Sequence, residues 1–220
     1  MHYKIQAKKT TDKVLRNRGV VMSNTDILEV TQYMKYYIDN YSIIENERIN
    51  LFKELCFGIA CVLQEWSGNT YVGIEKEKKK KHIFQNFFIC LNDLINYLTK
   101  NKISFLESKF LKCIKYNGKL YRYLGTGNPI DQEMRVKPIY NDIFVSWSKE
   151  ERNSYIESKL YGKMTLLYCD TSNKYFGIDL EGFQEFYNKT FKDSFYISRG
   201  NEREVVFPTI KETIYDIKYL

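Results

Sequence analysis

Two carboxylates one residue apart, Glu202 and Glu204, are the side chains of this sequence best suited to chemistry. The apolar run Val205-Val206-Phe207 follows them directly and is typical of a buried strand. In a strand, residues i and i+2 point to the same face, so Glu202 and Glu204 should project side by side if the strand extends back that far. Two adjacent like charges raise each other's pKa and are stabilised by a cation or by a positively charged reaction centre. A solvated strand end after the turn at 199–201 is the alternative, and this short run alone favours it.

Arg122 is the second candidate, within the apolar run at 120–124. On a strand it shares a face with Leu120 and Leu124, which predicts a guanidinium on the inward side. Burying an arginine is costly unless an anion pairs with it. A phosphate fits, because it accepts two parallel hydrogen bonds from the planar guanidinium. A carboxylate of this same chain is the alternative partner.

The third candidate is the run Phe144-Val145-Ser146-Trp147-Ser148. On a strand Ser146 and Ser148 share a face with Phe144, whereas Val145 and Trp147 share the other. Two hydroxyls in line can orient a ribose or a carboxylate. The alternative is an ordinary half-buried strand end.

Apolar spacing predicts the elements that must position these residues. Helical spacing predicts helices that begin at Ser23 and at Ser42, run over about 83–98, and begin again at Ser104. After 116–118 the spacing changes to alternation, which predicts strands at 120–124, 143–147, 164–168, 175–178, 205–207 and 214–219, besides a short one at 20–22. Helices first and strands second indicate an α+β fold rather than alternating βαβ units. The aromatic-rich stretch 179–193 is expected to be a mobile loop.

Composition limits the class of protein. The chain has 220 residues, 44% of them hydrophobic, which suits a globular domain with a substantial core. Its formal charge of +7 suits an anionic partner such as a dinucleotide, a nucleic acid or an acidic protein, without choosing among them. The lysine run at 75–81 contains no aromatic residue, so we interpret it as a solvated loop or the first turns of a helix.

Cysteine and histidine usage indicates no metal site. The five cysteines form no CxxC pair and there are two histidines, so zinc is not expected. Cys56, Cys90 and Cys113 lie among apolar residues and are interpreted as buried thiols of a reducing compartment. Neither a secretory signal nor a membrane-length apolar window is evident, so we expect a cytoplasmic protein, in its own cell or in one to which it is delivered, with no membrane partner.

The three candidate stretches, in this order, resemble the R–S–E class of mono-ADP-ribosyltransferases. That family has an arginine on its first strand, an aromatic-x-Ser-x-Ser strand, and a Glu-x-Glu turn that leads into a strand; here these are YRYLG, FVSWS and ERE-VVFP. Trp147 stands where the family usually has threonine. The resemblance implies one domain over 1–220, with a basic segment at 1–22, a helical part at 23–116, and a β-rich, mainly antiparallel, sandwich-like catalytic core at 117–220.

The resemblance also implies a reaction. NAD would be the substrate, with no metal, and its nicotinamide–ribose bond would break through an oxocarbenium-like transition state. Glu204 would stabilise the developing positive charge, and Ser146 would orient Glu204 and contact the ribose. Arg122 would anchor the NAD phosphate, with Tyr123 and Ser148 also on the NAD-binding side. Glu202 would activate the acceptor, and a glutamate there is associated in the family with arginine acceptors.

Three functions remain open. The resemblance favours a protein-arginine ADP-ribosyltransferase that serves as a toxin, effector or phage–bacterial conflict protein, with an antitoxin or immunity protein as a further partner. The basic charge permits an RNA or DNA acceptor instead. A non-catalytic binding module with degenerate motifs is the third interpretation, and it predicts no NAD turnover.

Overall fold

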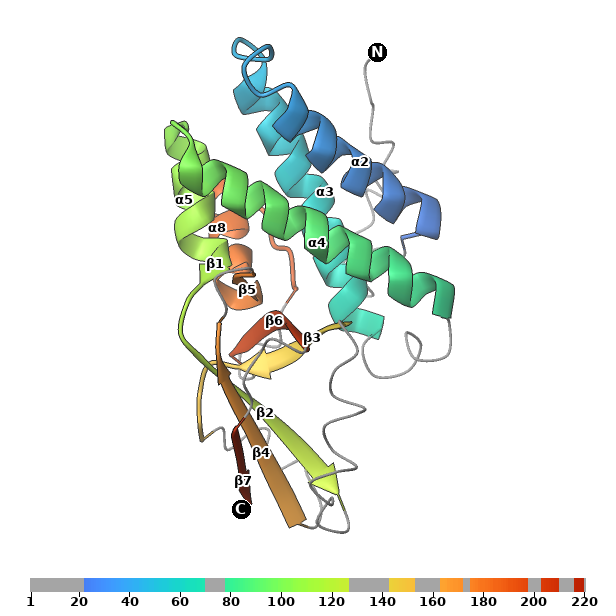
Figure 1. Cartoon of the computed structure of the whole chain (residues 1–220). Helices are drawn as coiled ribbons and strands as arrows, with labels where there is room; N and C mark the ends of the chain where they lie inside the picture. Colours follow the sequence, from blue (N-terminus) through green and yellow to red (C-terminus); the bar gives the residue numbers. More distant parts are fainter. Residues whose placement is uncertain are drawn as a thin grey trace. The chain divides into compact units, whose positions relative to one another are not determined.

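The computed structural model describes residues 22–69, 78–126, 143–152, 163–171, 175–197, 203–209 and 216–219. Its helices are α2 (Asn24–Asp39), α3 (Arg48–Asn69), α4 (Lys78–Lys100), α5 (Phe105–Ile114) and α8 (Leu180–Phe191). Its strands are β1 (Lys115–Tyr116), β2 (Lys119–Thr126), β3 (Ile143–Ser148), β4 (Lys163–Asp170), β5 (Gly177–Asp179), β6 (Glu204–Thr209) and β7 (Asp216–Tyr219). This confirms the predicted α+β class, with helices first and strands second apart from α8 (Figure 1).

The chain divides into two compact units. A helical unit takes the described residues up to Lys112 together with Gln184–Ile197. A sheet unit takes those of Cys113–Phe183 and those from 198 onward. The division therefore falls near the end of α5 and again within α8, rather than at a single point of the sequence.

Two capping boxes begin helices of the helical unit where the sequence predicts them. At α2, Asp26 N–H donates to Ser23 Oγ over 3.2 Å, and Ser23 N–H donates to Asp26 Oδ2 over 2.8 Å. At α5, Glu107 N–H donates to Ser104 Oγ over 3.3 Å, and Ser104 N–H donates to Glu107 Oε2 over 2.6 Å. Each box pairs backbone N–H groups that the first helical turn would otherwise leave unpaired.

Aromatic side chains fill the core of the helical unit. Helix α2 packs against both α3 and α4 (Figure 1). Phe52 and Phe110 meet edge to face with ring centroids 5.2 Å apart, and Trp66 meets Phe88 in the same way at 5.3 Å. Such edge-to-face pairs add to the stabilisation that burial of the rings provides. None of the helices in the described part of the chain combines the length and apolar character needed to cross a bilayer.

The starts of two helices and one strand prediction need correction. The second helix begins at Arg48, not Ser42, because the N–H groups of Ile43 and Ile44 both bond to the carbonyl of Asn40 in a turn after α2. The third begins at Lys78, so that the end of the lysine run forms its first turn. At 20–22 only Met22 lies among the described residues, and it is not in a strand.

The stretch 179–193, expected to be a mobile loop, contains helix α8. Asp179 acts as its N-cap, since Gly182 N–H donates to Asp179 Oδ1 over 3.0 Å. Leu180, Phe183 and Tyr187 are buried at helical spacing. The aromatic residues therefore form the apolar face of a helix, and the prediction of a loop was wrong.

The sheet unit is built on one seven-stranded sheet in the order β1-β5-β6-β3-β2-β4-β7. Every pairing described between these strands is antiparallel. One face carries a hydrophobic core cluster of Leu120, Trp147, Leu167, Cys169, Val205 and Phe207. That cluster draws on four strands and so fixes them in register.

Candidate functional site

The three strands that carry the candidate residues are neighbours in the sheet. Strand β3 lies between β6 and β2, although β6 follows β3 by more than 50 residues in the chain (Figure 1). The β3–β6 register runs from Ile143 opposite Thr209 to Ser148 opposite Glu204. Folding thus brings the arginine, serine and glutamate strands together.

Ser148 and Glu204 face each other across β3 and β6. Lys149 N–H donates to the carbonyl of Arg203 over 3.0 Å, which makes 149 and 203 a hydrogen-bonded pair. In an antiparallel ladder the next pair is therefore non-hydrogen-bonded, the kind with the closer side chains, about 4.5 Å between Cα atoms. Ser148 is 2% exposed and Glu204 is 6% exposed. A carboxyl group and a hydroxyl are thus buried together at this end of β3.

Ser146 shares the face of Ser148 and Glu204 but lies opposite Val206. It is half-buried, and it is a diagonal neighbour of Glu204, a relationship that typically separates Cα atoms by about 7–8 Å. The register therefore brings Ser148, rather than Ser146, directly to Glu204. Ser148 Oγ also accepts the Glu150 N–H over 3.1 Å and so stabilises the turn after β3.

Trp147 faces away from the two serines, as the sequence predicts. It belongs to the core cluster with Val205 and Phe207, and its Nε1–H donates to the carbonyl of Phe207 over 3.2 Å. A large indole takes this place because its N–H finds an acceptor while its rings fill the core. The residue that departs from the family's motif therefore packs behind the serines.

Arg122 lies on β2 opposite Leu167, on the face that buries Leu120. Its Nη1 donates to the carbonyl oxygen of Ser146 over 2.8 Å. Strands β2 and β3 share one registered pair in the structure as described, Tyr121 with Ser148. By register the Arg122 side chain thus starts from the face opposite the serines, and its guanidinium reaches the edge of β3. Tyr123, the neighbouring candidate, pairs with Leu166 on β4.

The strand that carries Glu204 does not include the residue before it, Arg203. Strand β6 begins at Glu204, and Arg203 has a φ of +50°. This left-handed conformation costs a non-glycine residue about 1–3 kcal/mol. The expectation of a shared strand face required strand conformation before Glu204, and at Arg203 that condition is not met. Glu202 itself lies outside the described residues.

Arg203 is held by ion pairs on both sides. Its Nη1 lies 3.0 and 2.9 Å from the two carboxyl oxygens of Glu181 in the first turn of α8, and its Nε lies 3.2 Å from Glu150 Oε1. Lys149 Nζ joins the same network, 2.9 Å from Asp179 Oδ2 and 3.3 Å from Glu181 Oε2. These five residues connect the end of β3, the start of α8 and the residue before Glu204.

The sequence alone did not predict this network. Arginine has no preference for the left-handed region, and nothing local distinguishes Arg203 from any charged residue at a strand end. Glu181 is 22 residues away in the chain. A sequence signal for the network was the Lys149-Glu150 pair after the serine strand. By itself, such a pair of charged residues indicates a solvated turn.

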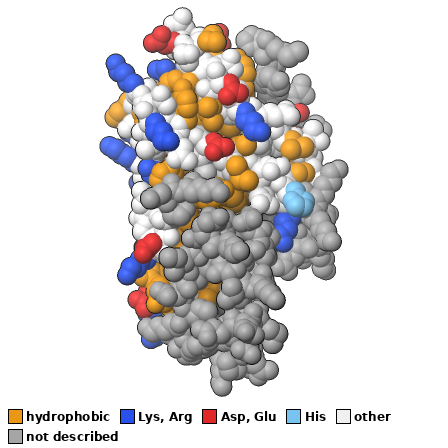
Figure 2. Space-filling view, viewed as in Figure 1, with side chains coloured by type: hydrophobic (Ala, Val, Ile, Leu, Met, Phe, Trp, Pro, Cys, Tyr) orange, Lys and Arg blue, Asp and Glu red, His pale blue; other side chains and the backbone are white. Residues whose placement is uncertain are grey.

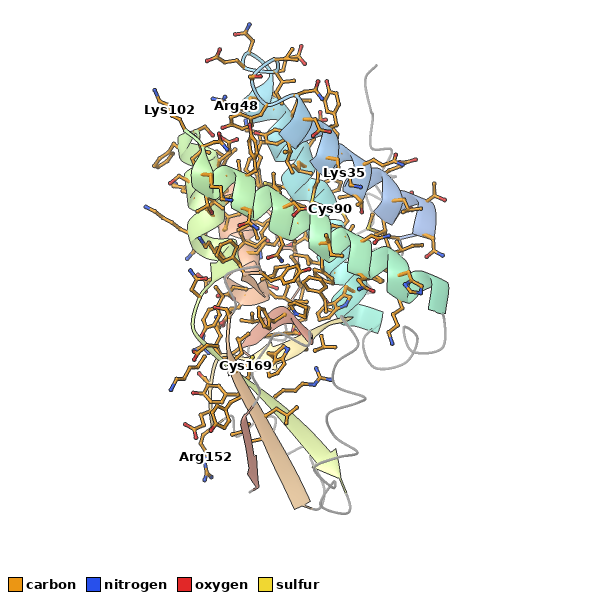
Figure 3. The ribbon with its side chains drawn as sticks, in the orientation of Figure 1. Lys35, Arg48, Cys90, Lys102, Arg152 and Cys169 are labelled. Carbon is orange, nitrogen blue, oxygen red and sulfur yellow. The ribbon has the colours of Figure 1, made fainter. Side chains whose placement is uncertain are left out.

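The cysteines of the described chain carry no reactive signature. All five are free thiols, and Cys56, Cys90 and Cys169 are buried, whereas Cys113 is half-buried, in contrast to the prediction. Burial raises the pKa of the Cys169 thiol to about 12, and the charge of Asp170 adds to the effect. Burial also raises the pKa of Cys90, against the opposing charge of Lys35; both residues are labelled in Figure 3. Buried thiols of raised pKa are poor nucleophiles.

Among the described residues no metal centre emerges, and the face shown in Figure 2 gathers no basic patch. Among them, no group of three or more His, Cys, Asp or Glu could hold a metal ion. On the face shown in Figure 2, the Lys and Arg side chains that are described are spread among acidic and apolar ones.

Comparisons with protein-family models, with curated protein sequences and with solved structures found no significant match.

Proposed function

We propose that this protein is an NAD-dependent mono-ADP-ribosyltransferase. The observation that carries the proposal is the adjacency of β6, β3 and β2 in one sheet. The three motifs lie far apart in the sequence, and a chance resemblance gives no reason for their strands to be neighbours. The buried pair of Ser148 and Glu204 and the contact of Arg122 with Ser146 support the proposal further.

Glu204 is the residue proposed to stabilise the transition state. Cleavage of the nicotinamide–ribose bond leaves positive charge on the ribose ring, with nicotinamide as the leaving group. A carboxylate beside that charge stabilises it more strongly where water is excluded, and Glu204 is 6% exposed. Ser148 and Ser146 on the same face are proposed to orient the ribose and the carboxylate.

Arg122 is proposed to bind the NAD phosphates. Its guanidinium is planar and presents donors in a fixed fork that matches phosphate oxygens. The hydrogen bond from Nη1 to the Ser146 carbonyl orients this fork beside the serine strand. Because the Arg122 side chain leaves β2 on the face opposite the serines, the proposal requires the phosphate to bind where the guanidinium reaches the edge of β3, the strand that lies between β2 and β6.

The acceptor is proposed to be an arginine of a protein. The Glu-x-Glu form of the motif is the basis, with Glu202 as the residue that positions and activates the acceptor. Because Glu202 lies outside the described residues, this step depends on the sequence resemblance. A nucleic acid is the alternative acceptor.

A labelling experiment tests the proposal. Purified protein, the Glu204→Gln variant and a matched Glu185→Gln control are incubated with labelled NAD and cell lysate; the Glu185 side chain is 60% exposed on α8. We expect Glu204→Gln to release nicotinamide and transfer label at least about 100-fold more slowly, and Glu185→Gln to match the wild type. Thermal melts show whether each variant is folded.

The outcomes separate the functions. Label removed by protease identifies a protein acceptor, and label removed by nuclease identifies a nucleic acid. If the folded wild type neither releases nicotinamide nor transfers label, with eukaryotic and bacterial lysates both supplied, the enzymatic proposal fails and a binding module takes its place.

A further inference from the structure

We infer that Arg203, the central residue of the Glu-x-Glu run, is a positioning residue that sets the place of Glu204 through its ion pairs with Glu181 and Glu150. The inference rests on the proposed function, because it concerns the geometry of the proposed catalytic carboxylate. It assigns a role to a residue for which the motif specifies no side chain.

The backbone of Arg203 is held in an unfavourable conformation. Its φ of +50° lies in the left-handed region, where a side chain with a Cβ atom is disfavoured. A conformation of this kind persists only where surrounding contacts hold it. Arg203 precedes the first residue of β6, so its conformation decides how the chain enters the strand at Glu204.

A set of polar contacts holds Arg203 in this conformation. The Arg203 carbonyl accepts the Lys149 N–H over 3.0 Å, and the guanidinium bonds to both carboxyl oxygens of Glu181. Glu181 is in turn fixed by Lys149, and its side chain is 17% exposed, against 48% for Arg203. Arg203 is exposed, but the carboxylate it pairs with is sheltered and bonded by two cations, which favours this contact over an isolated surface ion pair.

These contacts continue directly from the pair Ser148–Glu204 at the end of β3. Ser148 lies opposite Glu204, and Lys149 and Glu150, the next two residues, both contact Arg203. Movement of Arg203 would therefore shift Glu204 relative to Ser148. Displacement of a catalytic group by about 1 Å is enough to cost on the order of 100-fold in rate.

Three variants separate the backbone conformation from the ion pairs. Arg203→Ala removes the ion pairs and keeps a Cβ that disfavours the left-handed region. Arg203→Gly removes the same ion pairs but adopts a φ of +50° without strain. Glu181→Gln keeps Arg203 and weakens its anchor, and Lys189→Ala, on the exposed side of α8, is the control.

The measurement is steady-state nicotinamide release at varied NAD concentration. We expect Arg203→Ala to lower kcat about tenfold or more with the KM for NAD within about twofold, because substrate contacts stay intact while the catalytic carboxylate shifts. Arg203→Gly should recover a large part of that loss. Glu181→Gln should resemble Arg203→Ala, and the Arg203→Ala/Glu181→Gln double variant should lose little more than either single variant.

Two further measurements distinguish a positioning role of Arg203 from a purely structural one: the dependence of kcat on ionic strength, and amide hydrogen exchange. Raising salt from about 0.05 to 0.5 M should lower kcat of the wild type more than that of Arg203→Gly, since only the former depends on ion pairs here. Exchange at the Lys149 amide and the start of β6 should rise in Arg203→Ala while melting temperature is kept.

Two results would overturn the inference. If the wild type turns over NAD and Arg203→Ala has the same kcat and the same exchange, Arg203 has no positioning role and the proposed function stands. If the folded wild type does not release nicotinamide while Arg203→Ala still alters exchange at β6, the proposed function is what fails, and the role of Arg203 in positioning a catalytic group fails with it.

Discussion

Arg122 and Ser146 are joined by a hydrogen bond of 2.8 Å from the guanidinium Nη1 to the backbone carbonyl oxygen. The bond lies beside the pair Tyr121–Ser148, where β2 and β3 meet. It connects two motifs that the sequence separates by 24 residues. The strand that carries the serines is thus tied to the proposed phosphate ligand.

The first prediction concerns Arg122→Lys. Lysine keeps the positive charge but loses the planar fork, so the KM for NAD should rise about tenfold or more. The melting temperature should change little, because a lysine ammonium can still reach a carbonyl oxygen. Nicotinamide release at varied NAD measures the effect, and Arg152→Lys is the control, since Arg152 is exposed beyond β3 (Figure 3). An unchanged KM would show that Arg122 serves the sheet rather than the substrate.

The second prediction separates the two serines. Ser148 is 2% exposed and its Oγ accepts the Glu150 N–H, so Ser148→Ala should lower the free energy of unfolding by about 1 kcal/mol. Ser146 is half-buried, and Ser146→Ala should change that free energy by less than about 0.5 kcal/mol. Under the proposed function Ser146→Ala should still lower kcat/KM about tenfold. Urea unfolding and nicotinamide release on both variants test this, and a reversed order of the two stability effects would contradict it.

Local signals account for what the sequence predicts correctly. The capping boxes at Ser23 and Ser104 need partners three residues away, and alternation of apolar residues locates β2, β3 and β4. Features that depend on distant contacts were missed. The bend at Arg203 is held by Glu181, 22 residues earlier, so no local pattern could show it.

Helix α8 and the strand order illustrate the same limit in different ways. The buried residues of α8, which include Leu180, Phe183 and Tyr187, do have helical spacing. The short strand β5 directly precedes the helix, however, and the position of the stretch relative to the three motifs favoured a loop. The order of strands in the sheet is set by burial of Trp147 and Val205 in a shared core, which spacing along the chain does not encode. Both are tertiary effects.

The third prediction concerns Glu107, a fully buried carboxyl group in the helical unit. Tyr37 Oη donates to it over 2.6 Å, Tyr41 Oη over 3.2 Å, and the Ser104 N–H over 2.6 Å. Glu107→Ala leaves the Tyr37 hydroxyl and the Ser104 N–H without this acceptor and leaves Tyr41 with the Lys102 carbonyl, so it should lower the free energy of unfolding by about 3 kcal/mol. Glu107→Gln keeps one acceptor oxygen and should cost less. Urea unfolding measures both, and equal stability of Glu107→Ala and wild type would contradict the argument.

The fourth prediction is a loss of stability in alkali that involves the same cluster. Burial raises the pKa of Tyr41 from 10.0 to about 12, and Glu107 and Arg48 act on it in opposite directions. The ring of Tyr41 lies 4.6 Å from the Arg48 guanidinium, and its hydroxyl also donates to the Lys102 carbonyl over 3.2 Å; Arg48 and Lys102 are labelled in Figure 3. Burial and the hydrogen bond to Glu107 raise the pKa of Tyr37 as well.

The sign of the effect follows from proton binding. Between pH 10 and 12 the folded state keeps Tyr41 neutral while the unfolded state ionises it, so the unfolded state binds fewer protons. The contribution of the neutral tyrosines to the free energy of unfolding is therefore complete below pH 10. It is lost as the pH rises toward 12, by up to about 1.4 kcal/mol per pH unit for each tyrosine. Urea unfolding at about pH 8, 10 and 11 should show this fall.

Substitution separates the tyrosines from the buried thiols. Burial also raises the pKa of Cys61 from 9.0 to about 12, so thiols of this kind add to the loss of stability in alkali. The Tyr37→Phe/Tyr41→Phe variant keeps the thiols and removes both tyrosine hydroxyls, so its stability should fall less steeply above pH 10 than that of the wild type. Equal slopes for the two proteins would mean that the tyrosines do not titrate differently in the folded and unfolded states, and that the Glu107 cluster is open to water.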